Sequence, residues 1–395
     1  MFIVGIDIAK RNHEAVIIDA DGQIVNKAFP FGNSLAGYDF LLSHVKKLTC
    51  VKSQVVFAME STAHYWLALH ARLKKDGYPV IVMNPIQSHS LRNHFIRNAK
   101  TDVKDSLIIA DVVRFGRCRA SNIPQEHLLA LRELCRGRAY LTDMASDLKR
   151  KLIALLDRIF PEYETLFDSL FCKSSIAVLQ KYPIPQKIKN AHLEKLTKLL
   201  WDTSNGHFGE WKARQLKDAA ASSFGDEDTA GMYSTLMGIF LEQILALTEK
   251  SDDLERQIAE QFHSLDSKLD TIPGVGPLLG ASIFSEIGDV TRFSSVDKLL
   301  AYAGLDPTVK QSGEFKSGKN LMSKRGSAYL RRAIWMASTT AVHCDPMFQA
   351  YYEKKLSEGL HYMNTIGHVT RKMTAVIFAV LRDGKAYQPV LPTAG

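Results

Sequence analysis

Residues 2–8 read Phe-Ile-Val-Gly-Ile-Asp-Ile, a short apolar run that is typical of a buried β-strand. Two further runs, 14–18 and 23–29, flank an Asp21-Gly22 pair, which favours a tight hairpin turn. These three runs predict a sheet that begins with three antiparallel strands. Farther along, the sequence predicts a strand at 55–60 beside the first one, helices at 38–48 and 65–75, and a buried strand at 79–83. This alternation of strands and helices indicates an α/β domain.

Acidic residues occupy four positions in these predicted elements and after them. Asp7 lies in the first strand, and Glu60 closes the strand at 55–60. Asp102 and Asp105 are three residues apart in a stretch with helical apolar spacing, so both carboxylates should lie on one helix face. Clustered carboxylates repel one another unless a cation neutralises them, and hard divalent ions such as Mg²⁺ or Mn²⁺ prefer oxygen ligands. The joint pattern is typical of a ribonuclease H-like fold and predicts metal-dependent chemistry on nucleic-acid phosphodiesters.

Each acidic residue also has an ordinary structural explanation. Asp7 could cap a turn, Glu60 could be a charge at a helix N-terminus, and the Asp pair could lie on a solvated helix face. Sugar kinases and actin-type ATPases open with a similar strand and hairpin, but they need a glycine-rich phosphate turn after the first Asp. Residues 9–12 read Ala-Lys-Arg-Asn and offer no such turn. The metal-site interpretation therefore depends on the four acidic residues taken together.

Length, charge and cysteine content narrow the functional classes. The 395 residues suffice for two or three domains, and we place their limits at 1–125, 126–265 and 266–395. Lys and Arg number 50 against 42 Asp and Glu, and the net charge of +8 favours a polyanionic partner. The five cysteines lack the spacing of zinc ligands or of a disulfide framework. Because no basic leader and no apolar run of membrane-spanning length are evident, we expect a soluble cytoplasmic protein with no membrane partner.

The middle of the chain changes from α/β patterning to long helical repeats. Apolar side chains recur at steps of three and four in two segments, which predicts two long helices. These helices could form an antiparallel coiled-coil arm or an oligomerisation surface, or equally well a bundle packed on its own domain. Residues 167–228 between them predict short inserted helices. The two apolar seams consist of Leu141, Met144, Leu148, Leu152, Leu155 and Ile159, and of Leu236, Phe240, Ile244, Leu247, Leu254 and Ile258.

Two glycine-containing segments characterise the C-terminal part. Residues 271–281 carry Gly274 and Gly276 with the spacing of a helix-hairpin-helix, whose glycines let backbone N–H groups approach a phosphate; a plain Pro-Gly turn is the alternative. Residues 310–326 form a flexible, glycine-rich loop that is lined with basic residues and followed by a helix. Ser312 in this loop could attack phosphorus if cations hold the phosphate oxygens, although most such serines only cap turns or face solvent. The candidate DNA- or RNA-binding cations are Lys316, Lys319, Lys324, Arg325, Arg331 and Arg332.

With both motifs in view, the chain resembles the DEDD-type insertion-sequence transposases, the bridge-RNA-guided serine recombinases that are relatives of pilin-gene invertases. The similarity covers residues 1–117 and 269–381, whereas the long middle departs from the compact family pattern. Its second motif, Ser-Gly-x4-Gly-x3-Met-Ser-Lys-x-Gly followed by Leu-Arg-Arg, begins here at Ser312. The resemblance implies a RuvC-like domain whose metal-binding tetrad is Asp7, Glu60, Asp102 and Asp105, with Ser312 as the nucleophile.

The resemblance also implies partners. Family members act on double-stranded donor and target DNA, which a noncoding bridge RNA selects by base pairing, so that the protein reads shape and backbone. They are thought to work as homo-oligomers, dimers or tetramers, in which the serine domain of one subunit completes the carboxylate site of another. A coiled-coil arm would suit such an assembly.

The resulting hypothesis is a Mg²⁺-dependent DNA transposase that forms a phosphoserine intermediate on Ser312. Three rivals remain open. A site-specific invertase of the same family would use the same chemistry, whereas a RuvC-like nuclease or resolvase would use metal-bound water and would not need Ser312. A non-catalytic architectural protein that binds nucleic acid would tolerate both Asp7→Asn and Asp102→Asn.

Overall fold

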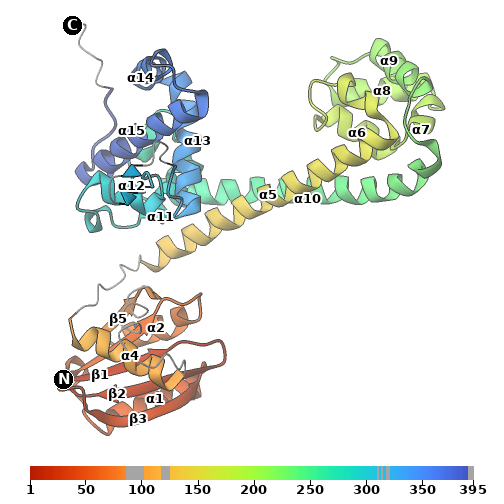
Figure 1. Ribbon diagram of the computed structural model, residues 1–395. Coiled ribbons are helices and arrows are strands. Elements are labelled where there is room, and N and C mark those ends of the chain that lie inside the picture. Colours follow the sequence, from red (N-terminus) through yellow and green to blue (C-terminus); the bar gives the residue numbers. More distant parts are fainter. Residues whose placement is uncertain (86–101, 117–124, 309–310, 313–314, 317–320, 390–395) are drawn as a thin grey trace, which may run out of the picture. The chain divides into compact units, whose positions relative to one another are not determined.

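The computed structural model describes residues 1–85, 102–116, 125–308, 311–312, 315–316 and 321–389. The side chains of residues 102–103, 227–228, 311–312 and 315–316 lie outside that description. The chain forms two compact units, Met1–Ile123 and Pro124–Gly395. The first unit is a mixed sheet with helices, and the second unit is mainly helical (Figure 1).

The N-terminal unit is built on a five-stranded sheet. Its strands are β1 (Phe2–Asp7), β2 (Asn12–Ile18), β3 (Ile24–Gly32), β4 (Val55–Glu60) and β5 (Val80–Met83). They lie in the order β3-β2-β1-β4-β5. The first three are antiparallel, whereas β4 is parallel to β1 and β5 is parallel to β4. The predicted antiparallel opening and the predicted strand beside the first one are confirmed.

Helices cover both faces of this sheet. α1 (Leu35–Lys46) and α2 (Trp66–Lys75) share one apolar core with Val4 and Ile6 of β1. The opposite face, which includes Ile3, packs against α4 (Asp102–Arg114). α4 approaches β1 closely, because a Cβ on Gly5 would overlap the carbonyl oxygen of Ser106. This close approach fixes the first turns of α4 against β1, near the end of that strand.

Two long helices, α5 (Glu126–Ile159) and α10 (Glu227–His263), run side by side in the second unit (Figure 1). Arg138 of α5 forms a 2.7 Å ion pair with Glu255 of α10. Toward the other end, Arg158 donates a 3.3 Å hydrogen bond to the hydroxyl of Tyr233. Residue numbers therefore rise along one helix as they fall along the other, which confirms the predicted pair of long helices and makes it antiparallel.

The segment between the long helices forms a helical tip with its own core. The buried Tyr163 hydroxyl donates a 3.0 Å hydrogen bond to the carbonyl of Ser175 inside this core. Met237 and Ile244 of α10 are buried in the same core, so the tip holds the adjoining end of the long helices. The short inserted helices predicted here are confirmed. They are η2 (Pro161–Leu166), α6 (Lys173–Lys181), α7 (Pro185–Lys189), α8 (Leu193–Thr203) and α9 (Glu210–Ala221).

A second helical core occupies the C-terminal part of this unit. Its helices are α11 (Pro277–Ile287), α12 (Val296–Ala303), α13 (Ala328–Cys344), α14 (Pro346–Ser357) and α15 (Tyr362–Asp383). The buried Glu286 carboxylate of α11 pairs with Arg136 of α5 at 2.7 Å and accepts a 2.9 Å hydrogen bond from Ser327, the N-cap of α13. Because a buried carboxylate without partners is strongly destabilising, this network ties α5 to two helices of the core.

Helix α10 tests the expectation that no segment of the chain is long and apolar enough to span a membrane. Its residues Thr229–His263 are long and apolar enough to cross a membrane by length and composition. The expectation that no run reaches that length is therefore wrong. Part of the apolar surface has a structural use, since Met237, Leu241 and Ile244 are buried in the core of the tip.

Candidate catalytic site

Two of the predicted acidic residues lie at the ends of neighbouring strands. β1 and β4 are parallel, and Ile6 pairs with Met59, so Asp7 and Glu60 end their strands at the same level. Side chains alternate between the faces of a strand. Asp7 therefore shares a face with Ile3, and Glu60 shares it with Ala58, which is the face covered by α4. The sheet thus brings these two carboxylates to one edge and one face.

The helical pair of acidic residues belongs to the helix that covers this face. Asp105 lies in the second turn of α4 and is 5% exposed. It precedes Ser106, whose carbonyl oxygen lies against Gly5, two residues before Asp7. Asp102 begins α4, but its side chain is outside the described part of the chain. Both positions lie on α4, so the predicted helical stretch is present there.

Metal coordination is not complete within the described residues. Among them, no group of three or more His, Cys, Asp or Glu side chains is arranged to hold a metal ion. The structure therefore brings Asp7, Glu60 and Asp105 to the same side of one sheet, but not to the mutual distances of metal ligands. The side chain of Asp102, the fourth member of the predicted set, does not enter that comparison.

Glu14 is an acidic residue that sequence reasoning did not include. It pairs directly with Asp7 across β1 and β2, so both side chains face α4. Like charges in directly opposed positions destabilise a sheet, so this pair adds negative potential beside the predicted site. The signal was present in the sequence, because Glu14 follows the same alternation as Val16 and Ile18. The strand register that places it beside Asp7 was missing.

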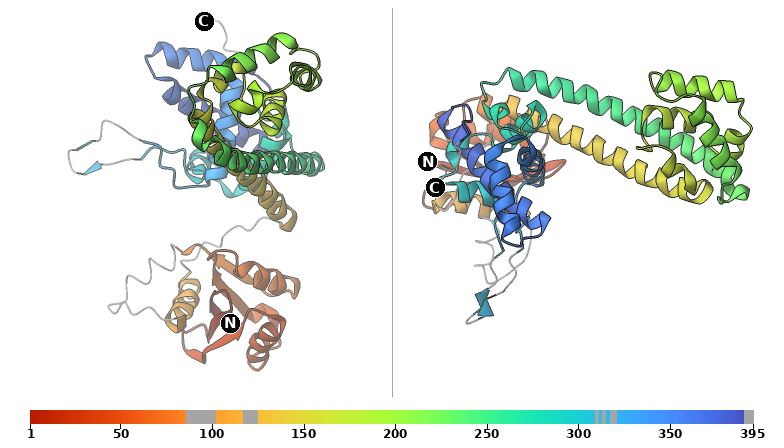
Figure 2. Two further views of the ribbon diagram at one scale, coloured as in Figure 1. Left: turned by 90° about the vertical axis from the view of Figure 1, so that its right-hand side faces the viewer. Right: turned by 90° about the horizontal axis from the view of Figure 1, so that it is seen from above.

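Ser312 lies in a β-ribbon of the second unit. β6 (Gln311–Ser312) pairs antiparallel with β7 (Phe315–Lys316), and Ser312 is opposite Phe315. Two residues separate the strands along the chain, and Ser312 is the last residue of β6. Within the described residues, this part of the predicted loop pairs as two short strands. The two strands lie away from the helices of the C-terminal core (Figure 2).

The base of this ribbon is held by a second set of strand-like contacts. Pro307 forms an antiparallel bridge with Met322, and the Thr308 amide donates a 2.7 Å hydrogen bond to the Leu321 carbonyl. The Ser323 hydroxyl donates to the Asp306 carboxylate. These contacts fix the level at which the ribbon leaves the core, so the position of Ser312 depends on them.

Two glycines allow the chain to cross itself below the ribbon. Gly304 has a φ of +67°, which favours glycine, and a Cβ there would lie 2.8 Å from the Gly326 amide nitrogen. A Cβ on Gly326 would overlap the carbonyl oxygen of Tyr302. Nothing but hydrogen fits at either position without movement of the backbone.

Replacing Gly326 by alanine should therefore loosen the ribbon base. We expect a loss of about 1–3 kcal/mol in local stability, because the added methyl group forces backbone atoms apart. Hydrogen exchange of the Thr308 and Ser323 amides measures that stability directly. Gly137 of α5 is the matched control, since nothing lies within 4 Å of a Cβ built there. Gly137→Ala should leave those amides unchanged, and equal protection in Gly326→Ala would refute the account of the crossing.

The predicted nucleic-acid-binding cations divide into exposed and engaged residues. Lys324 and Arg325 are exposed at the ribbon base, whereas Lys316 and Lys319 have side chains outside the described residues. Arg331 donates a 3.0 Å hydrogen bond to the carbonyl of Ala303, so it also braces the glycine crossing. The sixth, Arg332, forms a 2.8 Å ion pair with Asp143 of α5.

The expected helix-hairpin-helix segment precedes α11. A single 3-10 turn, η3 (Leu269–Thr271), leads into it. Gly274 has a φ of +85°, and a Cβ there would lie 2.5 Å from the Ala337 carbonyl oxygen of α13, so packing requires this glycine. Gly276 is the N-cap of α11, and a Cβ there would meet nothing within 4 Å. The backbone at Gly276 therefore has open space around it.

Two transposase family models match the chain. A DEDD-type IS110 transposase model matches residues 4–161, and a model of the transposase IS116/IS110/IS902 family matches residues 266–353. Together they cover more than half of the chain. The first match contains the sheet with its carboxylates, and the second contains the glycine segment and the serine ribbon.

Relatives of similar length agree with these matches. The 44.8 kDa protein of insertion element IS116 from Streptomyces clavuligerus is 28% identical over 98% of this chain and 96% of its own. The mini-circle putative transposase for IS117 from Streptomyces coelicolor is 25% identical over 99% and 97%. The pilin gene-inverting protein of Moraxella bovis is 24% identical over 97% of each chain. The chain belongs to the IS110 family of transposases, whose relatives include pilin gene-inverting proteins.

Proposed function

We propose that this transposase cleaves and rejoins DNA through a phosphoserine intermediate on Ser312, assisted by Mg²⁺ or Mn²⁺. The observation that carries the proposal is the gathering of Asp7, Glu60 and the helix of Asp105 on one face of one sheet. The order and directions of the five strands support a ribonuclease H-like, RuvC-like domain. The position of Ser312 at the end of β6, in a segment of the sequence rich in basic residues, supports its role as nucleophile.

The donor chemistry of the carboxylates fits a hard divalent cation. Asp7, Glu60, Asp102 and Asp105 would hold the ion, and all of them offer oxygen ligands. A bound ion supplies Lewis-acid polarisation of the scissile phosphate. Asp105 is buried at the start of α4, on the side of the sheet that Asp7 and Glu60 face.

Ser312 would perform the covalent step. Its Oγ loses a proton and forms a bond to phosphorus, while the bond from phosphorus to one deoxyribose oxygen breaks and leaves a free DNA hydroxyl. The phosphodiester is conserved in the protein-DNA link. A DNA hydroxyl that attacks this link rejoins a strand and returns the proton to Ser312, so no ATP is needed.

The surrounding cations would hold the nucleic acid. Lys316, Lys319, Lys324, Arg325, Arg331 and Arg332 are the proposed phosphate-binding residues. Lys324 and Arg325 are the best placed among the described ones, because their side chains are exposed. Gly276 at the start of α11 would add backbone N–H contacts to a phosphate beside a helix N-terminus, and Gly274 would shape that turn.

Separating free from protein-linked strands tests the covalent step. The transposase would be incubated with Mg²⁺ and DNA that carries the insertion-sequence ends, and products would be resolved in denaturing gels before and after protease treatment. We expect strands whose mobility changes with protease. Strands that carry free ends from the start would instead support the nuclease or resolvase, in which metal-bound water attacks.

A bridge RNA is the proposed guide for donor and target DNA. The resemblance to guided recombinases is the basis, and the net charge of +8 supports a nucleic-acid partner. Sequencing of RNA that co-purifies with the protein from cells carrying the complete insertion sequence provides the test. We expect one discrete noncoding species from beside the gene. A mixture of unrelated host RNAs would contradict the proposal that an RNA guides the protein, but it would not affect the proposed role of Ser312.

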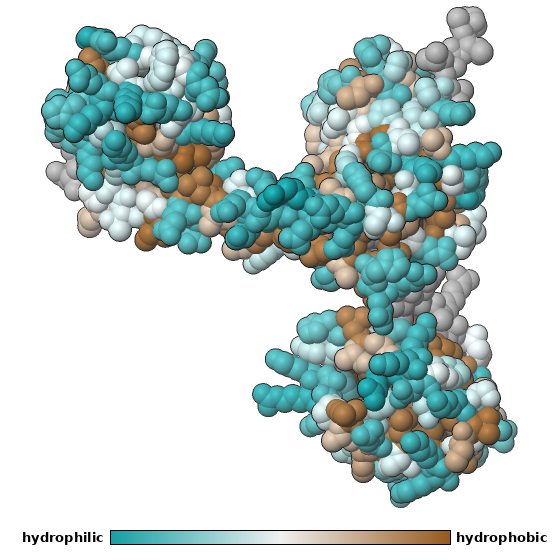
Figure 3. Space-filling view, turned by 180° about the vertical axis from the view of Figure 1, so that it is seen from behind, coloured by the Kyte–Doolittle hydropathy of each residue, from teal (hydrophilic) through white to brown (hydrophobic). Residues whose placement is uncertain are grey.

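A dimer or tetramer is the proposed working assembly, in the cytoplasm where the DNA lies. Ser312 and the carboxylates belong to different units of the chain, so different subunits can contribute them. α10 exposes Met232, Leu236 and Ile239 at steps of four and three residues, a stripe that suits helix–helix contact. Apolar surface is also visible where the tip meets the arm (Figure 3).

Programmed inversion is the alternative function within the same chemistry. Pilin gene-inverting proteins from two Moraxella species match nearly the whole chain. Transposition and inversion differ in the arrangement of the DNA sites rather than in the catalytic residues. The DNA that flanks the gene therefore distinguishes them: insertion-sequence ends support transposition, and an invertible pair of sites support inversion.

A further inference from the structure

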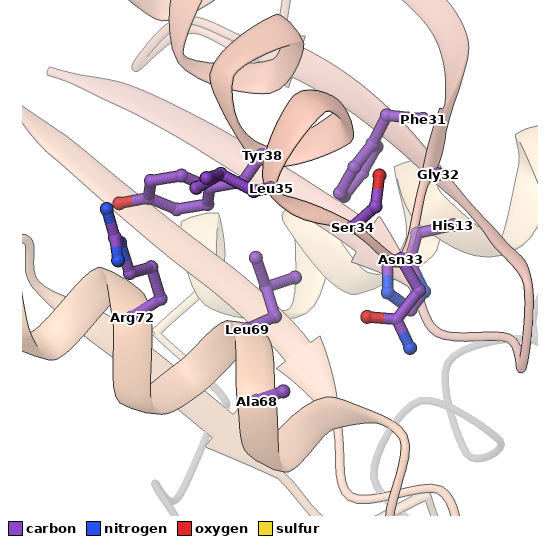
Figure 4. A pocket seen from close by; sticks show the side chains of 10 residues that line it. All are labelled: His13, Phe31, Gly32, Asn33, Ser34, Leu35, Tyr38, Ala68, Leu69 and Arg72. Atoms are coloured by element: carbon purple, nitrogen blue, oxygen red, sulfur yellow. The ribbon is translucent and has the colours of Figure 1, made fainter.

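A pocket in the N-terminal unit lies apart from the carboxylates, on the opposite face of the sheet. It has a volume of about 250 Å³ and is bounded by β2, β3 and the helices α1 and α2. Tyr38 and Arg72 stand at one end, and His13 and Asn33 at the other, with Leu69 between them (Figure 4). Pockets for drug-sized ligands measure roughly 300–1,000 Å³, so this one suits a single small ring system.

His13 presents an unused donor to this pocket. The side chain is 1% exposed, and its Nδ1 accepts a 3.1 Å hydrogen bond from the Ala9 amide. Because Nδ1 accepts, the proton of the neutral ring is on Nε2. Nε2 is buried and makes no hydrogen bond to any residue that the structure describes. Burial lowers the pKa of His13 and favours its neutral form, whereas the Asn33 side chain, which lies close enough to share a hydrogen with the ring, raises that pKa.

A buried N–H without a well-aligned acceptor is uncommon in folded proteins, so a water or a ligand that brings an acceptor would be stabilised there. Among ligands, such an acceptor would be a carbonyl oxygen or a ring nitrogen. Asn33 stands beside His13; its amide nitrogen donates a 3.5 Å hydrogen bond to the Lys10 carbonyl, and its second N–H and its oxygen can serve as a donor and an acceptor for a ligand. Together the two side chains can satisfy neighbouring acceptor and donor groups on the edge of one planar ring.

The other residues that line the pocket suit a planar ring and a phosphate group linked to that ring. Phe31, Tyr38 and Leu69 are buried apolar or aromatic side chains, and no acidic residue lines the pocket. Burial and a hydrogen bond to Asp76 raise the pKa of Tyr38, so its hydroxyl remains protonated and engaged. Arg72 lies over the Tyr38 ring with a half-exposed side chain and forms a 3.8 Å ion pair with Asp76, which lies outside the pocket lining. The N-terminus of α1, which has no acidic residue in its first turn, adds partial positive charge.

From this arrangement we infer that the pocket binds one unstacked nucleobase of a single-stranded nucleic acid. The base edge accepts from His13 Nε2 and pairs with the Asn33 amide, its faces contact Tyr38 and Leu69, and its phosphate lies toward Arg72. Recognition of a splayed base by aromatic contact and edge hydrogen bonds is the usual way in which single strands are read. The inference rests on the nucleic-acid partner proposed above, but not on the serine chemistry.

Two pairs of variants test the pocket. Ala68→Trp fills its mouth from α2, and Ala71→Trp places the same side chain on an exposed position of the same helix outside the pocket. His13→Asn keeps an acceptor near the Nδ1 position and loses the Nε2 donor, whereas His13→Gln keeps a donor near Nε2. Circular dichroism and thermal unfolding would establish that all four variants fold.

Binding would be measured by fluorescence anisotropy in EDTA, with short single strands of RNA and of DNA and with the matching DNA duplex. We expect Ala68→Trp and His13→Asn to raise the Kd for single strands about tenfold over their controls, and to leave the duplex unchanged. A loss confined to RNA or to DNA would identify the strand that the pocket reads. Photo-crosslinking with iodouracil-substituted strands should label the peptide that contains Phe31 and Tyr38.

Equal Kd values for Ala68→Trp and Ala71→Trp on every strand would overturn the inference, as would an equal loss on the duplex. Because EDTA removes the metal ions, covalent capture plays no part in the measurement. If Ser312 is not the nucleophile but the pocket variants still bind single strands more weakly, the proposed mechanism is refuted and the pocket assignment stands. If DNA is captured at Ser312 and the pocket variants bind single strands normally, the pocket assignment is refuted and the proposed mechanism stands.

Discussion

Replacing Ser312 by alanine should abolish covalent capture of DNA while leaving DNA binding intact. The hydroxyl is the proposed attacking group, and loss of the nucleophile in a serine enzyme lowers kcat by on the order of 10⁶-fold. The folded state should not change, because Ser312 pairs with Phe315 through backbone hydrogen bonds. Capture would be scored as protein-linked strands in denaturing gels, and binding as retarded complexes in native gels.

Ser323 provides the control within the same ribbon. Its hydroxyl donates to Asp306 at the base, so Ser323→Ala should weaken positioning and lower capture only in part. Comparable protein-linked DNA from Ser312→Ala and from the unmodified chain would remove Ser312 from the mechanism. Cleavage without capture in both would favour water as the attacking group.

Replacing Asp7 by asparagine should stop both cleavage and capture. Asp7 ends the central strand β1, between Glu60 on one side and Glu14 on the other, so an amide there removes a charged oxygen ligand from the middle of the acidic face. We expect a rate loss of about 10²–10³-fold, the scale seen when one preorganised electrostatic contact to a transition state is removed. Chelation with EDTA should produce the same loss, and added Mg²⁺ or Mn²⁺ should reverse it.

Asp21→Asn is the matched control for this prediction, because Asp21 is an exposed residue in the turn between β2 and β3. It should retain full activity. A mixture of Asp7→Asn and Ser312→Ala chains should regain part of the capture activity if one subunit's serine completes another subunit's carboxylate site. Full activity of Asp7→Asn alone would point instead to an architectural protein.

The N-terminal fold could be predicted largely because its signals are local. Alternating apolar runs and the Asp21-Gly22 turn define the first strands, and helical spacing defines α2, α4 and the two long helices. α1 begins three residues before the predicted start, because Ser34 caps it by accepting a 3.2 Å hydrogen bond from the Gly37 amide. That cap lies outside the apolar repeat from which the helix was predicted.

The sequence alone could not predict the register of the paired strands or the place where the chain crosses itself. Glu14 faces α4 and His13 faces the pocket because of the pairing of β2 with its neighbours, which no local pattern specifies. The pairing of β6 with β7 involves only two residues on each strand, too few for a periodic signal. Gly304 and Gly326 lie twenty-two positions apart, and their close approach depends on the path of the chain between them.

Locating the residue that carries DNA tests the central claim most directly. Captured complexes formed with Mg²⁺ would be digested with nuclease and protease, and the nucleotide-bearing peptide would be sequenced by mass spectrometry. The account predicts a nucleotide phosphate on Ser312, present with divalent metal and absent in EDTA and in Asp7→Asn. A nucleotide on any other residue, or cleaved DNA with no modified peptide, would contradict it.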